Sequence, residues 1–338
     1  MYSSALCIQG YVSKSCRSVC LGLKHERRPK IGTGGILANP VNLVLSSRIG
    51  RGSTQSFRAG IRSDVLKTYA MSTDPQTVEV VWALDFDGML CDSVGESAQT
   101  AWKAATKLWP GIFSSEESIS KKADIIEGMR VARPVIETGY ENIPMVRAML
   151  EGTSPESMLK GWETMLPQLM EKYGLNRAEM VELFGSTRDE WIEQDLEGWL
   201  APNRFYPGVT EATKTAFENP RGAMYIVTTK QARFTEALLR DMAGIPFPSD
   251  RIFSQTVSGR PKSEVLAMLM EQHPNAELRF FEDKMGTLEK IAQMEGMDPW
   301  KLFLVDWGYN TEEERERARA SDRIALIGPD QYAALMAP

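Results

Sequence analysis

The sequence predicts an α/β fold, an open parallel Rossmann-like sheet with an inserted all-helical domain. From residue 204 onward, short apolar runs rich in β-branched residues alternate with segments of helical periodicity. One further strand-like run, residues 78–86, stands apart from the others, and a long stretch of helical character follows it. Alternating strands and helices with short connections are typical of a parallel sheet covered on both faces. We therefore expect an α/β core of residues 78–93 and 204–338, interrupted by a helical cap of residues 94–203.

The first predicted strand is the segment VEVVWALDF, residues 78–86. It is almost unbroken in apolar character, which indicates a strand buried on both faces. The segment Asp85-Phe86-Asp87-Gly88 closes it with a turn signal. Two acids therefore stand two residues apart at the end of a buried strand.

Residues 94–203 show helical spacing, in segments such as ESAQTAWKAATKLW, with few β-branched clusters. Gly and Pro punctuate the stretch, which favours about five separate helices. Its tryptophans occur at helical spacing and are predicted to form the core of this domain. They are Trp102, Trp109, Trp162, Trp191 and Trp199.

After residue 204 the strand pattern returns. We predict strands at 223–229, 251–257, 277–283 and 301–307. The segments between them have helical periodicity, and Gly244 is expected to end the helix that follows the first of these strands.

Residues 1–70 differ from the rest, since they contain 11 Lys or Arg residues but only two acids, Glu26 and Asp64. A basic, serine-rich stretch without a continuous apolar core is typical of an organelle transit peptide. We expect residues 1–72 to be a transit peptide and a disordered linker, directing the chain to the chloroplast or another plastid. The alternatives are a mitochondrial destination, or a basic arm that binds nucleic acid.

The remainder of the chain is acidic, since the whole carries a net charge of −6 in spite of the basic N-terminal stretch. An acidic body disfavours nucleic-acid and membrane partners, which attract basic surfaces. No apolar run approaches the roughly 20 residues of a membrane-spanning helix. Only Cys91 remains outside the N-terminal stretch, which excludes a disulfide framework there.

Polar groups gather where the predicted strands end, and in an open α/β sheet reactive groups lie outside those carboxyl ends. The groups are carboxylates, hydroxyls and a lysine, namely Asp85, Asp87, Thr228, Thr229, Lys262, Glu282 and Asp283. Such a set suits phosphoryl transfer, in which catalysis consists largely of positioning and charge neutralisation. Because an anionic nucleophile and a phosphate repel each other, we expect a hard divalent cation, Mg²⁺, between them.

In this chemistry Asp85 attacks phosphorus and forms an acyl phosphate. Asp87 points the same way in an extended segment and transfers the proton, provided that its pKa is raised. Gly88 lacks a Cβ atom and lets the chain turn sharply beside the phosphate.

These residues resemble the motifs of the haloacid dehalogenase (HAD) superfamily, in particular the phosphoglycolate phosphatase and β-phosphoglucomutase type with a helical cap. The first motif, D-x-D-G-x-L-x-D-S, is matched from Asp85 to Ser93, with Met89 where Thr is common. YIVTTK and GRPKSEVL are similar to the second and third motifs, and LVDWGYNTEEE to the strand and turn after the fourth. The resemblance covers nearly all of residues 78–338, weakly across the cap.

The resemblance implies a role for each matched residue. Asp85 is implied as nucleophile and Mg²⁺ ligand, and Asp87 as general acid/base with a backbone carbonyl on the metal. Thr228 and Lys262 are implied as phosphate ligands, with Thr229 as the rival hydroxyl, and Asp283 as a metal ligand. Dehalogenase members lack the second acid of the first motif, so phosphate chemistry is favoured.

The fourth motif departs from the common pattern, because Glu282 stands where Gly is usual and Thr287 where a second Asp is usual. We expect Glu282 to reach the ion next to Asp283. In the cap, Arg130 and Arg133 are candidates to bind a substrate carboxylate or second phosphate, or else form surface ion pairs. Lys230 and Lys284 are predicted to be solvated.

The sequence as a whole predicts an enzyme, a Mg²⁺-dependent phosphatase that hydrolyses a small phosphorylated metabolite through an aspartyl-phosphate on Asp85. One alternative is a phosphoglucomutase-like phosphotransferase, which shares every motif. The other is a catalytically silent domain with a binding or regulatory role, motivated by Glu282 and Thr287.

Overall fold

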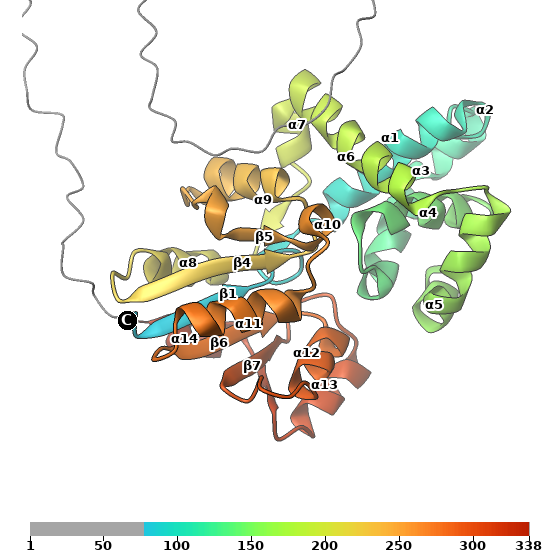
Figure 1. Cartoon of the computed structure of the whole chain (residues 1–338). Helices are drawn as coiled ribbons and strands as arrows, with labels where there is room; N and C mark the ends of the chain where they lie inside the picture. Colours follow the sequence, from blue (N-terminus) through green and yellow to red (C-terminus); the bar gives the residue numbers. More distant parts are fainter. Residues whose placement is uncertain (1–77, 338) are drawn as a thin grey trace, which may run out of the picture. The chain divides into compact units, whose positions relative to one another are not determined.

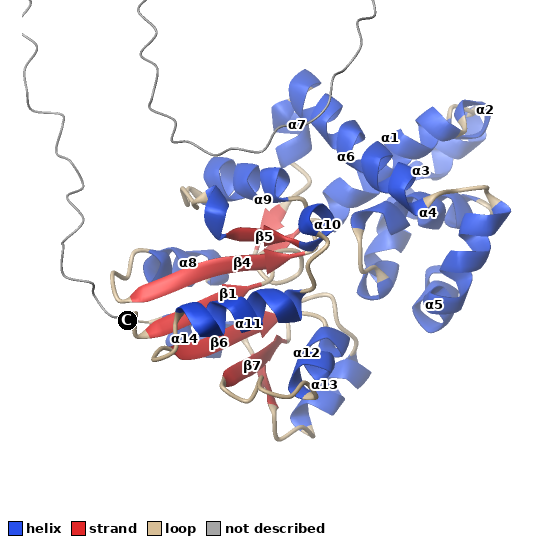
Figure 2. Cartoon of the chain, viewed as in Figure 1, coloured by secondary structure: helices blue, strands red, loops and turns tan. Residues whose placement is uncertain are grey.

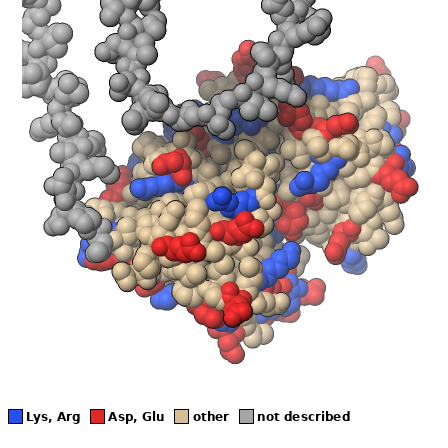
Figure 3. Space-filling view, in the orientation of Figure 1, with Lys and Arg blue, Asp and Glu red and all other residues tan. Residues whose placement is uncertain are grey.

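The computed structural model describes residues 78–337. The expected transit peptide and linker, residues 1–72, lie outside the described residues. Within the described part of the chain, no helix has the length and apolar character needed to cross a membrane. On the face shown in Figure 3, basic and acidic side chains are interspersed.

The core is a six-stranded sheet in the order β5-β4-β1-β6-β7-β8, and every neighbouring pair is parallel (Figures 1 and 2). The strands are β1 (Val80–Leu84), β4 (Gly222–Thr228), β5 (Ile252–Ser254), β6 (Glu277–Glu282), β7 (Trp300–Val305) and β8 (Ile324–Ile327). The predicted open parallel sheet is confirmed. The sequence analysis missed β8, a run of only four residues, and the predicted strand 251–257 ends at Ser254, where α10 (Gln255–Ser258) begins.

Alternate residues of β1 face opposite sides of the sheet. Trp82 and Leu84 belong to one apolar cluster, and Val81 and Ala83 to another. All four side chains are fully buried. The unbroken apolar run at 78–86 is therefore explained by two covered faces, since a strand side chain points to each face in turn.

Helices cover both faces (Figure 2). On the Trp82 face the covering helices are α8 (Val209–Phe217), α9 (Ala232–Leu238) and α14 (Pro329–Met336). On the Val81 face they are α11 (Lys262–Gln272), α12 (Met285–Ala292) and α13 (Glu312–Arg319). As predicted, Gly244 ends the segment that begins with α9, in a left-handed conformation.

The helical insert lies between two short strands, β2 (Cys91–Asp92) and β3 (Arg204–Phe205), which pair antiparallel. It contains seven α-helices among the described residues, rather than about five. They are α1 (Val94–Leu108), α2 (Pro110–Phe113), α3 (Glu116–Ala132), α4 (Asn142–Leu150), α5 (Pro155–Lys172), α6 (Arg177–Gln194) and α7 (Leu196–Leu200). One apolar cluster, drawn only from residues 98–184, forms the interior of this insert.

The prediction for two of the tryptophans is wrong. Trp191 and Trp199 do not join the interior of the insert but pack in the cluster of the Trp82 face, with Phe86 and Phe234. The end of α6 and α7 therefore attach the insert to the sheet. Periodicity along a helix identifies a buried face, but it does not identify the neighbour that buries it.

A row of four charged side chains, three of them buried, also joins the insert to the sheet. Glu96 on α1 accepts two hydrogen bonds of 2.7 Å from the guanidinium of Arg188 on α6. Its other neighbour is Lys230, which follows β4 and whose Nζ lies 3.6 Å from Glu96 Oε2 and 3.2 Å from Asp87 Oδ1. We call Asp87, Lys230, Glu96 and Arg188 the charge row. The prediction that Lys230 is solvated is wrong, since its side chain is only 1% exposed.

We predict that Glu96→Gln destabilises the protein in a pH-dependent way. Burial alone would raise the pKa of Glu96, but Arg188 and Lys230 outweigh it and lower the pKa below its ordinary 4.5. Removing one partner of a buried ion pair costs about 3–5 kcal/mol. This contribution is present above the ordinary pKa and is lost as pH falls through the lower pKa of the folded state. The difference in the free energy of unfolding between wild type and variant, measured by urea denaturation, should thus be smaller at pH 3 than at pH 7.

The matched control is Glu190→Gln, because Lys107 and Glu190 join the same two helices through an exposed ion pair. We expect this variant to lose at most about 1 kcal/mol. Equal destabilisation of Glu96→Gln at pH 7 and pH 3 would contradict the prediction.

Candidate active site

The predicted site residues meet at the carboxyl ends of three adjacent strands. Asp85 follows β1, Thr228 ends β4, and Glu282 and Asp283 stand at the end of β6. Since β1 pairs with both β4 and β6, these ends lie side by side at one edge of the sheet. The backbone of Asp85 is fixed there by a 2.9 Å hydrogen bond from its N–H to the carbonyl of Phe281.

The turn after Asp87 requires glycine. Gly88 has φ +86°, a backbone conformation that costs other residues free energy. A Cβ atom there would lie 2.0 Å from Asp283 Oδ2 and 2.6 Å from the ring of Tyr309. Gly88 therefore lets the turn approach the end of β6, and any side chain would push the acids apart.

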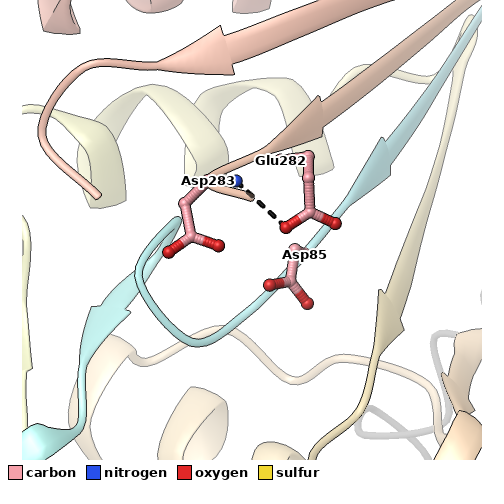
Figure 4. A group of neighbouring side chains, drawn as sticks. All are labelled: Asp85, Glu282 and Asp283. Atoms are coloured by element: carbon pink, nitrogen blue, oxygen red, sulfur yellow. Dashed lines mark hydrogen bonds between the residues drawn. The ribbon is translucent and has the colours of Figure 1, made fainter. Parts of the chain in front are cut away.

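Three buried carboxylates converge at this edge (Figure 4). Asp85, Glu282 and Asp283 each offer an oxygen, and these oxygens lie within 4.8 Å of one another. None of the three residues is more than 6% exposed. The carboxylate of Asp87 is not part of this group, although the sequence analysis placed Asp87 with the metal ligands through its backbone carbonyl.

Lys262 supplies positive charge beside the group. Its Nζ lies 2.7 Å from Glu282 Oε2 and 3.0 Å from Asp85 Oδ1. Burial alone would lower the pKa of Lys262, but Asp85 and Glu282 raise it overall, so the ammonium stays charged. Burial raises the pKa of Glu282 well above its ordinary value, and although Lys262 opposes this, Asp85 and Asp283 add to it. Among the described residues, Lys262 is the one cation that forms an ion pair with this group.

The residues fit a hard divalent cation. Oδ1 of Asp85 and Oδ1 of Asp283 are buried and accept no hydrogen bond from the described residues; the approach of Lys262 to Asp85 is an ion pair without hydrogen-bond alignment. Oδ2 of Asp283 accepts a 2.8 Å bond from the backbone N–H of Tyr309, which orients the carboxylate. An all-oxygen donor set with unpartnered carboxylate oxygens is what Mg²⁺ prefers. Glu282 adds a third carboxylate where the fourth motif departs from its usual pattern.

Asp87 is held differently. Its Oδ1 accepts hydrogen bonds from Ser93 Oγ and from Lys230 Nζ, the latter at 3.2 Å. Burial alone would raise the pKa of Asp87, but Lys230, then Arg133 and Ser93, outweigh it and the pKa is lowered. The expectation of a raised pKa at Asp87 is wrong, because a buried lysine, Lys230, lies beside the carboxylate and lowers its pKa.

A cavity of about 260 Å³ opens beside these groups. Asp85, Asp87, Lys262 and Asp283 line it. Of the two candidate hydroxyl residues, Thr229 lines the cavity and donates a 3.1 Å hydrogen bond to the carbonyl of Glu137. Thr228 is only 1% exposed, and its Oγ1 accepts from the N–H of Lys230.

The two cap arginines have different surroundings. Arg133 lines the cavity, is 8% exposed, and stacks over Tyr309 with 4.1 Å from the guanidinium carbon to the ring centre. Its Nε is buried and has no partner in the described residues. Arg130 does not line the cavity, and its Nη1 instead lies 2.8 Å from Asp92 Oδ2.

Sequence reasoning missed three residues that shape the site. Lys230 and Lys284 were predicted to be solvated, but Lys230 is buried against Asp87, and Lys284 lines the cavity and donates to the carbonyl of Pro134. Tyr309 bridges the first and fourth motifs. Its hydroxyl accepts from the N–H of Ser93 and donates to Asp92, and its backbone N–H donates to Asp283 Oδ2. The position of Lys230 directly after a strand end is the one signal that could have indicated it.

The comparisons with known proteins give structural likeness only. No protein-family model and no curated protein sequence matches the chain. A predicted phosphatase from Clostridium acetobutylicum is 14% identical, with 77% of this chain and 99% of that chain covered and a TM-score of 0.47. Two further solved structures are similar to the same extent. A predicted phosphoglycolate phosphatase from Haemophilus somnus is 13% identical, with 77% of this chain and 97% of that chain covered and a TM-score of 0.46. A haloacid dehalogenase-like hydrolase from Streptococcus pneumoniae is 14% identical, with 76% of this chain and 98% of that chain covered and a TM-score of 0.45. At these identities and scores the likenesses carry no argument about activity, which has to come from the geometry of the site.

Proposed function

We propose that the chain is a Mg²⁺-dependent phosphatase of the haloacid dehalogenase type, acting on a small phosphorylated metabolite. The observation that carries the proposal is the placement of the Asp85 carboxylate. It lines a cavity, it has an oxygen without a hydrogen-bond partner, and Lys262 and two further buried carboxylates surround it. A carboxylate with these neighbours is suited to attack a phosphoryl group.

In the first half of the reaction, a carboxylate oxygen of Asp85 forms a bond to phosphorus while the bond from phosphorus to the ester oxygen breaks. The leaving oxygen takes the electron pair of that bond and a proton from Asp87. A bound phosphate dianion adds negative charge beside Asp87 and so raises its affinity for the proton. Lys262 holds the phosphoryl oxygens during the transfer, and the hydroxyl of Thr229 joins it when its hydrogen bond turns from the carbonyl of Glu137 to the phosphoryl group.

In the second half, water attacks the aspartyl-phosphate, and Asp87 takes a proton from that water. The carboxylate of Asp85 and inorganic phosphate are released. Asp87 is then needed as an anion, the form that Lys230 and Ser93 favour.

Asp85, Glu282, Asp283 and the backbone carbonyl of Asp87 would hold the cation. When bound, Mg²⁺ offsets the repulsion between the phosphate and the carboxylates and stabilises the charge of the transferring group.

Arg133 and Lys284 would select the substrate. Both line the cavity, and the buried Nε of Arg133 lacks a partner. We therefore expect a substrate with a second anionic group, such as a carboxylate, at a distance from the phosphate.

We predict that Asp85→Asn lowers phosphate release by roughly 10³-fold or more, as removal of a nucleophile does in other enzymes. The assay is phosphate release from p-nitrophenyl phosphate and a panel of phosphorylated metabolites at saturating Mg²⁺. Asp306→Asn is the matched control, because Asp306 also follows a strand of the sheet, β7, but is exposed and does not line the cavity. A wild type that hydrolyses none of these esters would refute the phosphatase and favour the silent domain.

Asp283→Asn should weaken Mg²⁺ binding by at least about tenfold, since it removes charge from a predicted ligand. Isothermal titration calorimetry of the full chain with MgCl₂, in the absence of substrate, measures this affinity independently of activity. The exposed Asp306→Asn should bind Mg²⁺ as the wild type does. Unchanged affinity in Asp283→Asn would show that Asp85, Glu282 and Asp283 do not form the Mg²⁺ site.

Arg133→Met should raise KM about 10- to 100-fold for substrates with a second anionic group, because a hydrogen bond to a charged group contributes about 1.5–3 kcal/mol. The KM for p-nitrophenyl phosphate, which has no such group, should change much less. Arg130→Met serves as the control, since Arg130 lies outside the cavity. Equal effects of Arg133→Met on both kinds of substrate would contradict the assignment.

A further inference from the structure

The charge row places two residues of the helical insert behind the acid that transfers the proton. Asp87 and Lys230 belong to the α/β core, whereas Glu96 is on α1 and Arg188 is on α6. Glu96 is fully buried, and Arg188 is 4% exposed. Neither residue lines the cavity beside Asp85.

Glu96 is the fixed point of the row. Its Oε1 accepts hydrogen bonds from Arg188 Nε at 2.7 Å and from Thr100 Oγ1 at 2.6 Å, and its Oε2 accepts from Arg188 Nη2 at 2.7 Å. Arg188 is itself packed against the ring of Phe184, with 4.4 Å to the ring centre. A bidentate pair of this kind fixes the orientation of both planar groups.

Lys230 is shared between two carboxylates. Its ammonium lies 3.2 Å from Asp87 Oδ1 and 3.6 Å from Glu96 Oε2. In a buried environment these attractions are strong, and the position of the ammonium depends on both. Because Glu96 is fixed by Arg188, Lys230 is fixed, and Lys230 together with Ser93 engages Oδ1 of Asp87. In the proposed reaction the other oxygen, Oδ2, transfers the proton to the leaving oxygen of the substrate.

We propose that Glu96 and Arg188 are positioning residues for proton transfer, which hold the Asp87 carboxylate in place through Lys230. This inference rests on the proposed function and adds to it. The geometry of proton transfer then depends on α1 and α6, so the insert acts on the chemical step in addition to bounding the cavity.

The row also has a charge balance. Asp87 and Glu96 are negative, Lys230 and Arg188 are positive, and their charges cancel. Arg188→Met leaves Lys230 as the only cation beside Glu96, which draws the ammonium away from Asp87. Glu96→Gln leaves two cations facing one carboxylate. The double variant restores the balance, so its effect should be smaller than the product of the two single effects.

The test compares two leaving groups. Departure of p-nitrophenolate needs little help from an acid, whereas departure of an alkoxide requires a proton. We would measure kcat/KM, which excludes hydrolysis of the aspartyl-phosphate, for p-nitrophenyl phosphate and for the alkyl phosphate that the wild type hydrolyses fastest. Asp87→Asn is the reference, and it should lower the alkyl-to-aryl ratio by about 10²- to 10⁴-fold.

Glu96→Gln and Arg188→Met should each lower the alkyl-to-aryl ratio by about tenfold. This is a part of the rate enhancement that general acid catalysis by Asp87 contributes. Arg233→Met is the matched control, because Arg233 makes a bidentate pair with Asp189, next to Arg188, but on the surface, where both side chains are 49% exposed. Its ratio should equal that of the wild type. If Glu96→Gln does not fold, Thr100→Val removes only one hydrogen bond to Glu96 and should change the ratio in the same direction by less.

A merely structural role gives a different result, since loss of folded enzyme lowers both rates equally and leaves the ratio unchanged. An unchanged ratio in Glu96→Gln, Arg188→Met and Thr100→Val would overturn the positioning role. If the wild type and Asp85→Asn behave as expected while that ratio is unchanged, the proposed function stands and only this inference fails. A wild type inactive on both esters would overturn both.

Discussion

The structure depends on the burial of several carboxylates at the carboxyl edge of one sheet. Asp85, Glu282 and Asp283 lie with oxygens within 4.8 Å of one another, and a fourth acid, Asp87, stands two residues beyond Asp85. Buried charges are costly unless they are paired. The protein places Lys262 beside the first group and Lys230 beside Asp87. Oδ1 of Asp85 and Oδ1 of Asp283 accept no hydrogen bond from the described residues, and buried carboxylate oxygens of this kind fit a divalent cation.

The two lysines divide the acids into two chemical environments. Lys262 contacts Asp85 and Glu282, whereas Lys230 contacts Asp87 and, behind it, Glu96. Acids whose surroundings differ in this way can take different roles in one reaction. The pKa of Asp87 is lowered by Lys230 despite burial, while burial and neighbouring acids raise that of Glu282. The difference in surroundings between Asp85 and Asp87 thus depends on residues from other parts of the chain.

The helical insert is attached to the core by contacts of several kinds. Apolar packing places Trp191 and Trp199 in the cluster on the Trp82 face of the sheet. Polar contacts include the stacking of Arg133 on Tyr309 and the hydrogen bond from Thr229 to the carbonyl of Glu137. Several of these contacts involve residues that line the cavity, so the position of the insert and the shape of the site are linked.

The amino-acid pattern was sufficient to predict the open parallel sheet, the helical character of residues 94–203, and the gathering of Asp85, Lys262, Glu282 and Asp283 at one edge. These follow from local patterns, because strand periodicity, turn residues and the rule that parallel strands end together need no knowledge of distant contacts. The folded chain was needed to show that Thr229 rather than Thr228 lines the cavity, that Trp191 and Trp199 pack on the sheet, and that Lys230 is buried. A lysine on a loop has the same local pattern whether it is solvated or paired, and its partners Asp87 and Glu96 are more than 130 positions away in the chain. Burial of a charge is set by what packs against it, and that is a property of the folded chain.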